Sequence, residues 1–361
     1  MKKILFYATY GGYGHIARNL SINKYLSSSN KIFLVSGMRW DGKLPPNIKY
    51  NKLKEIPCSQ IINEDGRIIF KRFYSGPQNI EDFRKHLIEY INILKKINPD
   101  IVVVDLTSEI TIITKLLGYK VISVYETGIR NDLRHLLSYK NCDGILVPYT
   151  KGFTDVSYLP KEIQKKMFFS GGFCRFSGYK ILPKVNAKKI INESKKLIVV
   201  SVGKGDYAEH VIKICVEAIK DVKGVNAIFF SRIKLNKKIS NIRFIRVQPA
   251  KVYKYLNAAD LIICGAGYST IMENCYFKVP IITIPLKRPY GEQIIKAQNL
   301  KKFGAAEVLY EEKISKSLLT KKIKGILNNP KRIKKVVNSH KKVINGNGAK
   351  RAAKWISNLI K

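Results

Sequence analysis

The sequence predicts an α/β protein of two domains, each built on a parallel sheet with helices on its faces. The first observation is length, because 361 residues are more than one hydrophobic core usually holds. The second is that short apolar runs alternate with helical segments, which is typical of parallel sheets. The third is that this alternation starts again at residue 197. Two successive series indicate two Rossmann-like domains whose parallel sheets face a central cleft.

The first series runs from residue 4 to residue 148. Short apolar runs predict its strands at residues 4–7, 31–36, 101–104, 121–125 and 144–148. Helical periodicity predicts helices at residues 16–26, 79–97 and 110–117. Residues 37–76 follow neither period, so we expect an extra short strand or a functional loop in this stretch.

The second series follows a polar connection over residues 168–187, where Gly171, Gly172 and Pro183 indicate a boundary. Its strands are predicted at residues 197–202, 227–230, 244–247, 261–264 and 280–285. Its helices are predicted at residues 210–220 and 251–256, at the turn after residue 267, and after residue 293. The final residues, 348–361, have the pattern of a basic helix with an apolar face.

The chain is strongly basic. It has 66 Lys and Arg residues against 26 Asp and Glu residues, and its formal net charge is +40. Such a field attracts polyanions, including acidic lipid headgroups, nucleic acid and anionic glycans. A basic protein without a fixed polyanionic partner is the alternative.

The sequence also bounds the compartment. No apolar run approaches the ~20 residues that a membrane-spanning helix needs. The apolar run at the N-terminus is too short for a signal peptide and is predicted to be the first core strand. Six cysteines are scattered without the spacing of a metal site, which favours reduced thiols in a cytoplasmic protein.

The clearest chemistry lies between residues 258 and 309. A predicted strand leads through Gly265 and Gly267 into a helix that would start near Ser269 and Thr270. The backbone N–H groups and positive dipole end of a helix start bind phosphate well. A strand–helix–strand unit whose glycines only form turns is the alternative.

Three acidic or amide side chains accompany this helix start. Glu273 follows on the same helical face and suits a ribose diol, while Glu292 and Gln293 leave a later strand and suit sugar hydroxyls. The run Ala-Gly-Tyr-Ser-Thr-Ile-Met-Glu at residues 266–273, the Glu292–Gln293 pair and Gly-Ala-Ala at residues 304–306 resemble the C-terminal half of glycosyltransferase family 28. That group includes the N-acetylglucosaminyltransferase that acts on the lipid intermediate of peptidoglycan. The resemblance covers about fifty residues and is more specific than one glycine-rich loop.

The resemblance implies a GT-B fold that binds a nucleotide-sugar, with UDP as the default nucleotide. Family members hold the diphosphate near the residues that match Gly203 and Lys204, and they contact the base through backbone atoms near Gln248. The donor-binding residues that it implies are Gly12, Gly14, Gly203, Lys204, Gln248, Gly267, Tyr268, Ser269, Thr270, Glu273, Glu292 and Gln293.

The loop after the first strand offers a candidate base. Gly11-Gly12-Tyr13-Gly14-His15 would let the backbone approach the donor, and His15 would open the next helix. A histidine that titrates near neutral pH suits removal of a proton from a sugar hydroxyl. A helix cap is the alternative role for His15. The form Gly-x-Gly-His-x-x-Arg, completed by Arg18, also resembles a nucleotide-sugar hydrolase of the same fold.

Asp105 ends a predicted strand at the edge of the sheet where α/β sites form, and it resembles the aspartate that pairs with the loop histidine in plant-type UDP-sugar transferases. It would orient His15. An N-cap of the next helix is the alternative for Asp105. Glu126, at the exit of another strand, could contact the acceptor or replace His15 as base.

These expectations combine into an inverting, metal-independent glycosyltransferase with no cofactor and no metal site. Residues 1–175 would form the acceptor domain, residues 176–347 the nucleotide-sugar domain, and residues 348–361 a helix that, by the resemblance, can return to the N-terminal domain. The acceptor would be a hydroxyl on a lipid-linked sugar or glycan at the inner membrane surface, chosen by the irregular stretch before residue 79. The enzyme would be cytoplasmic and peripheral to an anionic membrane.

Three alternatives remain at this point. One is a nucleotide-sugar hydrolase with water as acceptor. Another is a glycosyltransferase that acts on DNA or another polyanion. The last is a binding protein that uses a degenerate GT-B fold, which Glu273 and the Glu292–Gln293 pair disfavour.

Overall fold

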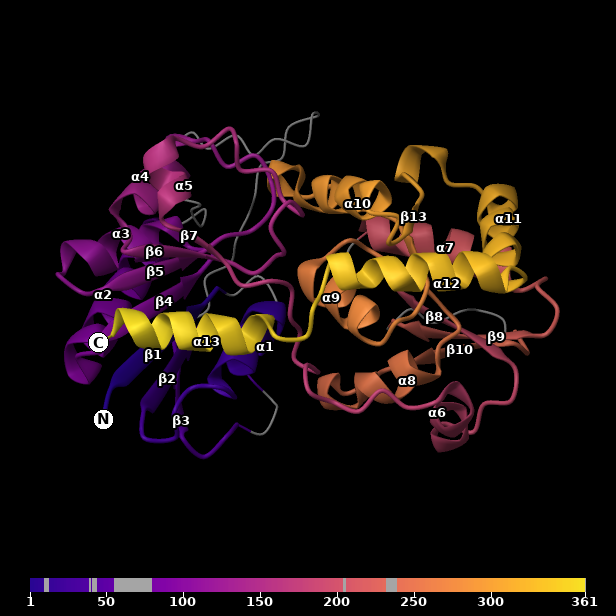
Figure 1. Cartoon of the computed structure of the whole chain (residues 1–361), viewed down its shortest axis with the longest axis horizontal. Coiled ribbons are helices and arrows are strands. Elements are labelled where there is room, and N and C mark those ends of the chain that lie inside the picture. Colours follow the sequence, from indigo (N-terminus) through magenta and orange to yellow (C-terminus); the bar gives the residue numbers. More distant parts are fainter. Residues whose placement is uncertain are drawn as a thin grey trace. The chain divides into compact units, whose positions relative to one another are not determined.

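The computed structural model describes residues 1–9, 13–38, 40, 44–54, 80–203, 206–231 and 239–360. The chain forms two compact units (Figure 1). Unit 1 contains Met1–Arg175, Pro289–Glu292 and Gly346–Lys361, and unit 2 contains Phe176–Arg288 and Gln293–Asn345.

Unit 1 is built on a seven-stranded sheet with the order β3-β2-β1-β4-β5-β6-β7. Its strands are β1 (Lys3–Ala8), β2 (Lys31–Ser36), β3 (Ile48–Lys52), β4 (Ile101–Asp105), β5 (Val121–Val124), β6 (Gly144–Val147) and β7 (Met167–Phe169). All neighbouring pairs are parallel. Its helices are α1 (Tyr13–Asn23), α2 (Ile80–Ile97), α3 (Ser108–Leu116), α4 (Leu133–Asn141), α5 (Lys161–Lys165) and α13 (Gly348–Leu359).

Unit 2 is built on a six-stranded parallel sheet with the order β10-β9-β8-β11-β12-β13. Its strands are β8 (Lys196–Ser201), β9 (Val225–Phe230), β10 (Ile242–Ile245), β11 (Leu261–Cys264), β12 (Ile281–Thr283) and β13 (Glu307–Val308). Its helices are α6 (Lys184–Ile190), α7 (Asp206–Ile219), α8 (Val252–Ala258), α9 (Tyr268–Tyr276), α10 (Glu292–Lys302, whose first residue belongs to unit 1), α11 (Lys316–Leu327) and α12 (Pro330–Ser339).

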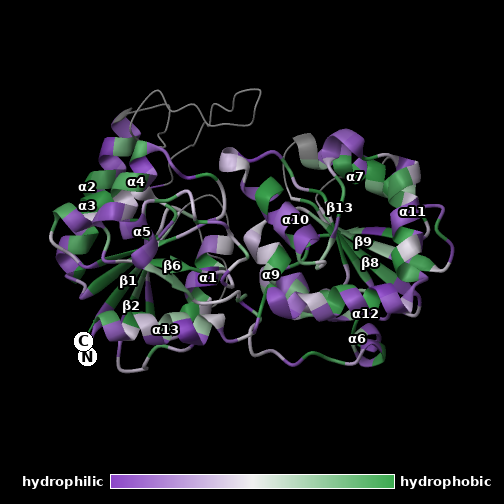
Figure 2. Ribbon diagram, turned by 45° about the horizontal axis from the view of Figure 1, so that its top comes forward, coloured by the Kyte–Doolittle hydropathy of each residue, from purple (hydrophilic) through white to green (hydrophobic). Residues whose placement is uncertain are grey.

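The prediction of an α/β protein with two parallel sheets is confirmed. The central strands read as continuous apolar runs because helices cover both faces of each sheet, and every residue of β4 and β11 is buried. Figure 2 shows the same contrast, with hydrophobic strands inside helices of mixed hydropathy.

Helices α4, α5, α6, α11 and α12 were not predicted. Among the strands, the main differences from prediction lie at the edges of the sheets. Strand β10 begins at Ile242, two residues before the predicted 244–247. The irregular stretch holds the extra strand β3, while most of the rest of residues 37–76 lies outside the described residues. Strands β7 and β13 were not predicted because runs of three and two residues carry no readable period.

The C-terminal helix α13 packs on the sheet of unit 1. Ala349, Ala352, Ala353 and Ile356 are fully buried and share a core with strands β1, β2, β4, β5 and β6. Trp355 on the same helix stacks on Phe168 at a centroid distance of 4.9 Å. The helix therefore covers apolar sheet surface that would otherwise face water.

The first turn of α13 is a point of close backbone contact. A Cβ added at Gly348 would collide with the carbonyl oxygen of Gly171 and would lie 2.8 Å from that of Gly172. Both obstacles are backbone atoms, so relief requires the helix to move. Glycine is required here because no side chain fits.

Gly348→Ala should lower the free energy of unfolding by about 1–3 kcal/mol, because the added methyl displaces α13 from its seat. Gly325→Ala is the matched control, since its new Cβ would meet Arg332 Nη1 at 3.5 Å, an ordinary contact, inside helix α11. That control should be neutral or stabilising by up to about 1 kcal/mol. Urea denaturation measures both changes. Equal effects of the two substitutions would contradict the close backbone contact inferred at Gly348.

Candidate active site

Polar side chains of unit 1 gather at the carboxyl ends of its parallel strands. The register places Asp105, the last residue of β4, level with Ala8 of β1 and Val124 of β5. Helix α1 starts shortly after β1, and its third residue is His15. This edge of a parallel sheet is where α/β proteins bind their ligands.

The structure brings His15 and Asp105 together. His15 Nδ1 lies 3.0 Å from Asp105 Oδ1. The His15 side chain is 18% exposed, whereas that of Asp105 is fully buried. Helix α3 takes Thr107 as its N-cap, so the alternative role of Asp105 as a cap is wrong. The pair has the arrangement of an accessible base and a buried orienting carboxylate.

Arg18 also binds Asp105, and sequence reasoning noted it only as part of a motif. Its Nε donates to Asp105 Oδ2 at 2.8 Å and its Nη2 donates to Oδ1 at 2.5 Å. His15 and Arg18 lie three residues apart on α1 and therefore share a helical face, which is the signal that could have identified Arg18. The carboxylate thus bridges a histidine and an arginine.

This bridge determines the protonation pattern. Burial raises the pKa of the Asp105 carboxyl, but the charge of Arg18 and the hydrogen bonds from His15 and Arg18 outweigh burial and hold that pKa below its ordinary value. His15 Nδ1 lies 3.0 Å from Asp105 Oδ1, which can only accept, and 3.2 Å from Arg18 Nη2, which can only donate. The shorter contact with the ionised carboxylate favours the proton on Nδ1, which leaves Nε2 as the basic nitrogen in the neutral form of the ring. The tautomer is assigned from this hydrogen bond.

Glu126 follows β5 and is built into the same network. Its Oε2 accepts from Arg18 Nη1 at 3.3 Å, and its Oε1 accepts from the hydroxyl of Tyr149. The Glu126 side chain is 3% exposed. Both oxygens are engaged and withdrawn from solvent, so the geometry supports a structural role for Glu126 instead of a base.

In unit 2, the predicted phosphate seat is the start of helix α9. Gly267 is the N-cap and Tyr268 is the first helical residue, one position before the predicted start. The helical hydrogen-bond ladder begins with Ile271 N donating to Gly267 O at 3.0 Å, so the N–H groups of Ser269 and Thr270 precede it. A Cβ at Gly267 would meet no atom within 4 Å, which leaves room for a ligand beside these amides.

Gly265 and Gln293 hold the turn before this helix. A Cβ at Gly265 would lie 2.8 Å from the carbonyl oxygen of Val202, so only glycine fits. Gln293 Oε1 accepts from Ala266 N at 3.0 Å and from Leu286 N at 3.1 Å. The side-chain oxygen of Gln293 therefore stabilises the turn, and its Nε2 remains the atom that can donate to a sugar.

Glu273 and Glu292 lie on the two helices that follow these turns. Glu273 is 6% exposed and lies on α9 at helical spacing from Ser269 and Thr270. Glu292 is half-buried and opens α10. A carboxylate at each position can accept hydrogen bonds from hydroxyl groups.

The remaining predicted donor residues have varied positions. Gly203 follows β8 with a φ of +122° that favours glycine, and Gly14 lies in the first turn of α1. Gln248 is exposed and lines a pocket of about 530 Å³ in unit 2 together with Arg243, Arg246, Lys251 and Lys254. Gly12 and Lys204 lie outside the described residues.

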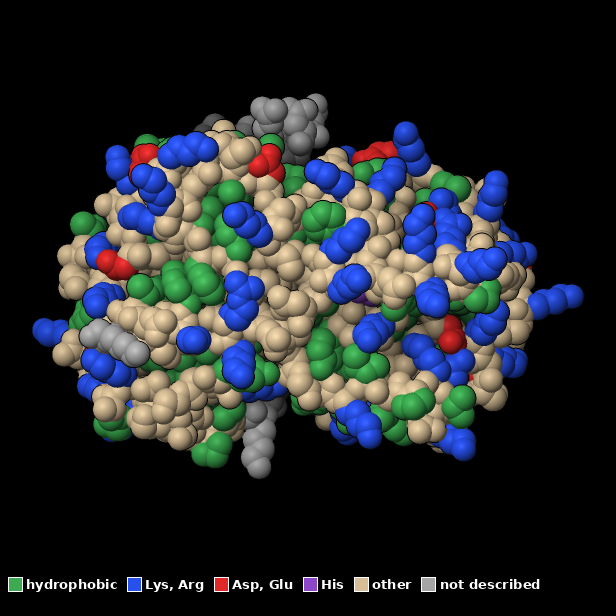
Figure 3. Space-filling model, in the orientation of Figure 1, with side chains coloured by type: hydrophobic (Ala, Val, Ile, Leu, Met, Phe, Trp, Pro, Cys, Tyr) green, Lys and Arg blue, Asp and Glu red, His purple; other side chains and the backbone are tan. Residues whose placement is uncertain are grey.

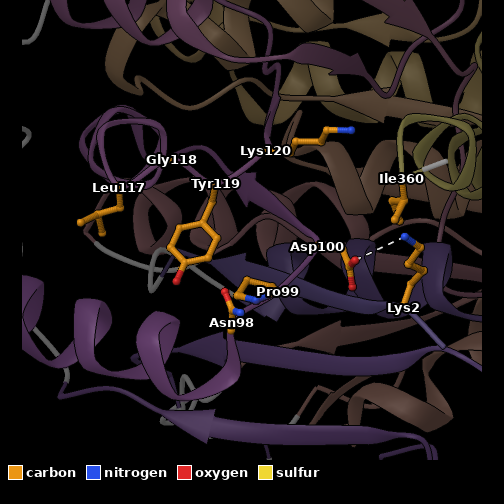
Figure 4. A pocket seen from close by; sticks show the side chains of 9 residues that line it. All are labelled: Lys2, Asn98, Pro99, Asp100, Leu117, Gly118, Tyr119, Lys120 and Ile360. Atoms are coloured by element: carbon orange, nitrogen blue, oxygen red, sulfur yellow. Dashed lines mark ion pairs between the residues drawn. The ribbon is translucent and has the colours of Figure 1, made fainter.

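A second pocket, of about 590 Å³, is distant from this chemistry. It lies where β1, β4 and β5 begin and is lined by Lys2, Asn98, Pro99, Asp100, Leu117, Gly118, Tyr119, Lys120 and Ile360 (Figure 4). Figure 4 shows Lys2 and Asp100 facing each other as an ion pair. The pocket occupies the amino-terminal edge of the sheet, opposite the edge that carries His15, so we do not assign it to the reaction.

Comparison with known proteins agrees with this fold. The family model described as glycosyltransferase family 28 C-terminal domain matches residues 180–356. The chain is 24% identical over 343 residues to a UDP-N-acetylglucosamine–N-acetylmuramyl-(pentapeptide) pyrophosphoryl-undecaprenol N-acetylglucosamine transferase of Alkaliphilus metalliredigens, with 90% of each chain covered. The chain is a GT-B glycosyltransferase whose C-terminal half is a family 28 domain.

Other relatives of this glycosyltransferase extend over nearly the whole chain. A second transferase of this name, from Bacillus cereus, is 24% identical over 358 residues, and the alignment covers 92% of this chain and 94% of the relative. MurG of Acinetobacter baumannii has a TM-score of 0.65 at 14% identity, with 99% of both chains covered. The glycotransferase of kitacinnamycin has a TM-score of 0.70 at 15% identity and covers 99% of this chain and 98% of its own. These structures share the fold.

Arg18→Met should lower the free energy of unfolding of the glycosyltransferase by about 3–5 kcal/mol at pH 7, because it leaves Asp105 charged and buried without its main partner. The pKa of Asp105 then rises, so the folded variant binds a proton that its unfolded state does not bind. Its deficit relative to wild type should therefore shrink between pH 7 and pH 5. In an Asp105→Asn background, Arg18→Met should cost much less. Urea denaturation of the single and double variants at pH 7 and pH 5 measures these differences. A loss of stability from Arg18→Met that is the same at both pH values and in the Asp105→Asn background would contradict the proposed charge pairing.

Proposed function

We propose that this glycosyltransferase transfers a sugar from a nucleotide-sugar, UDP-linked by default, to a hydroxyl acceptor with inversion at the anomeric carbon. The observation that carries the proposal is the His15–Asp105 pair. Its 3.0 Å contact, the buried carboxylate and the partly exposed imidazole are what a hydroxyl-activating base requires.

The reaction follows from the protonation pattern of that pair. His15 Nε2 removes the proton of the acceptor hydroxyl, and the oxygen attacks C1 of the sugar. The C1–oxygen bond to the diphosphate breaks as the new C1–oxygen bond forms, so one displacement inverts the configuration. The proton remains on His15, and the ionised Asp105 stabilises the imidazolium.

Unit 2 supplies the donor site in this proposal. The amides of Ser269 and Thr270 and the dipole of α9 bind the diphosphate and stabilise the charge that develops as it leaves. By the family resemblance, Gly203, Lys204 and Gln248 match the positions at which family members hold the diphosphate and the base, and in this proposal Glu273 accepts hydrogen bonds from the ribose. A helix start can supply this stabilisation without a metal ion, so we propose that catalysis is metal-independent.

The acceptor is proposed to be lipid-linked and presented at an anionic membrane surface on the cytoplasmic side. The curated relatives are named for transfer to a pyrophosphoryl-undecaprenol-linked acceptor. The net charge of +40 supports attraction to acidic headgroups. Figure 3 shows one face of the molecule, where Lys and Arg side chains are widespread and acidic side chains are few. No helix in the described part of the chain is long and apolar enough to cross a bilayer.

The activity is tested with a panel of nucleotide-sugars and a lipid-linked acceptor. His15→Ala should lower kcat by about 10²–10⁴-fold, because it removes the base. Its affinity for the nucleoside diphosphate should stay unchanged, since the proposal assigns binding of the diphosphate to the start of α9 and not to the His15 side chain. The anomeric configuration of the product, read by NMR, tests inversion, and activity in EDTA tests metal independence.

Two results would overturn parts of this proposal. Stoichiometric release of sugar without any acceptor would identify a hydrolase, the alternative that shares the Gly-x-Gly-His-x-x-Arg loop. An unchanged nucleotide affinity in Glu273→Ala would remove the donor assignment from α9.

Membrane attraction makes a separate prediction. The protein should float with vesicles that contain anionic lipid and should float much less with neutral vesicles, because the attraction is electrostatic. Raising the salt concentration to 1 M shortens the screening length to about 3 Å and should release the protein from anionic vesicles. Equal binding to both kinds of vesicle, or binding to neither, would contradict electrostatic docking.

A further inference from the structure

The segment Pro289–Glu292 belongs to unit 1, although the residues before and after it in the sequence belong to unit 2. The chain leaves unit 2 after Arg288, places Pro289–Glu292 in unit 1, and returns to unit 2 at Gln293. This short segment ends on Glu292, the proposed sugar-binding carboxylate. Its second residue, Tyr290, has a φ of 61°, a left-handed conformation that is rare for residues with a side chain.

The ring of Tyr290 is held on three sides by the loop and helix that follow β5. The guanidinium of Arg130 lies over the ring at 4.6 Å from its centroid. The ring of His135 meets it edge-on at 5.0 Å and an interplanar angle of 82°. Arg134 Nη2 donates to its hydroxyl at 2.5 Å. Cation–π, aromatic and charge-assisted contacts therefore act on one side chain.

The backbone of the segment is held as well. Ile129 N donates to Tyr290 O at 3.2 Å, and Thr127 Oγ1 donates to Glu292 O at 3.4 Å. A Cβ at Gly128 would lie 2.9 Å from Tyr290 Cβ and 3.0 Å from Tyr290 O. The segment thus lies directly against the backbone at Gly128, where only glycine leaves enough room.

The groups that hold Tyr290 are themselves fixed. Arg130 Nη1 lies 3.2 Å from His135 Nε2, and His135 Nδ1 lies 2.6 Å from Asp132 Oδ2. Burial is the main cause that lowers the pKa of His135 to about 4, so near neutral pH the ring is uncharged. It can then donate to Asp132 and accept from Arg130 at the same time.

This cluster continues into the assembly around the base. Arg130 Nε donates to the carbonyl oxygen of Glu126 at 3.0 Å, and the Glu126 carboxylate accepts from Arg18. Arg18 in turn binds Asp105, the partner of His15. One residue, Glu126, therefore connects the groups that hold Tyr290 with the groups that orient the base.

We propose that Tyr290 is a positioning residue for the sugar of the donor. Its side chain, held by Arg130, Arg134 and His135, fixes the backbone before Glu292 and so presents the Glu292 carboxylate to the sugar hydroxyls. This inference rests on the proposed function. It separates two tasks, because orientation of the sugar is assigned to the segment that carries Tyr290 and Glu292, and binding of the nucleoside diphosphate to the start of α9.

Three variants and one control test the inference. Tyr290→Phe removes the Arg134 hydrogen bond and keeps the ring. Tyr290→Ala removes the side chain, and Gly128→Ala pushes the segment away. Tyr90→Phe is the matched control, because it also removes a buried tyrosyl hydrogen bond in unit 1, to Thr114 Oγ1 at 2.6 Å, at a place the reaction does not use.

In the proposal, Tyr290→Ala and Gly128→Ala lower kcat/KM for the nucleotide-sugar by about 10–100-fold through misplacement of Glu292. Tyr290→Phe lowers it less. The inhibition constant of the nucleoside diphosphate, which lacks the sugar, should not change, and discrimination between epimeric donor sugars should narrow. In a Glu292→Ala background, Tyr290→Ala should cause little further loss. Tyr90→Phe should leave all these values at wild type.

Different outcomes remove different claims. A wild-type protein that turns over no nucleotide-sugar removes the proposed function. If the wild type is active but the Tyr290 variants lose as much affinity for the nucleoside diphosphate as for the nucleotide-sugar, then Tyr290 has only a structural role. Full additivity of Tyr290→Ala and Glu292→Ala also overturns the positioning role. If Tyr290→Ala does not fold, Tyr290→Phe and Gly128→Ala decide.

Discussion

The buried charge of Asp105 is the constraint on which the arrangement of unit 1 depends. A carboxylate without solvent is stable only when cations and hydrogen-bond donors surround it. Arg18 and His15 meet this need, and both come from α1, so that helix has to lie over the end of β4. The hydrogen bond between His15 and Asp105 therefore has two effects: it stabilises the buried carboxylate and it orients the imidazole of the base.

Unit 2 meets a different constraint, which is the close approach of backbone to backbone before α9. Gly265 lies against the carbonyl of Val202, and Gln293 uses one oxygen to bind two amides of neighbouring turns. These contacts align the start of α9 without placing a side chain over it, since Gly267 leaves open space. Phosphate recognition by a helix start needs this kind of rigid, uncovered backbone.

The segment around Tyr290 is held by a third set of contacts, within unit 1. Its neighbours in the sequence, Arg288 and Gln293, belong to unit 2, but the segment itself packs in unit 1. Two buried arginines, a neutral histidine and two acidic side chains surround it, and their mutual hydrogen bonds and ion pairs stabilise the network. The left-handed backbone conformation of Tyr290 costs conformational free energy, and the contacts of this segment with residues 127–135 offset that cost.

Local patterns in the sequence were enough to predict the α/β class, the two parallel sheets, the central strands and, to within one residue, the start of α9, because these depend on local periodicity and turn chemistry. The sequence also named His15 and Asp105, since each follows a strand end where such folds place their sites. It did not determine that Arg18 shares Asp105, that Glu126 is withdrawn from solvent, that Gln293 supports a turn or that Tyr290 packs among Arg130, Arg134 and His135. Those facts depend on contacts between residues far apart in the chain, which only the register of the strands and the packing of the helices bring within hydrogen-bond distance.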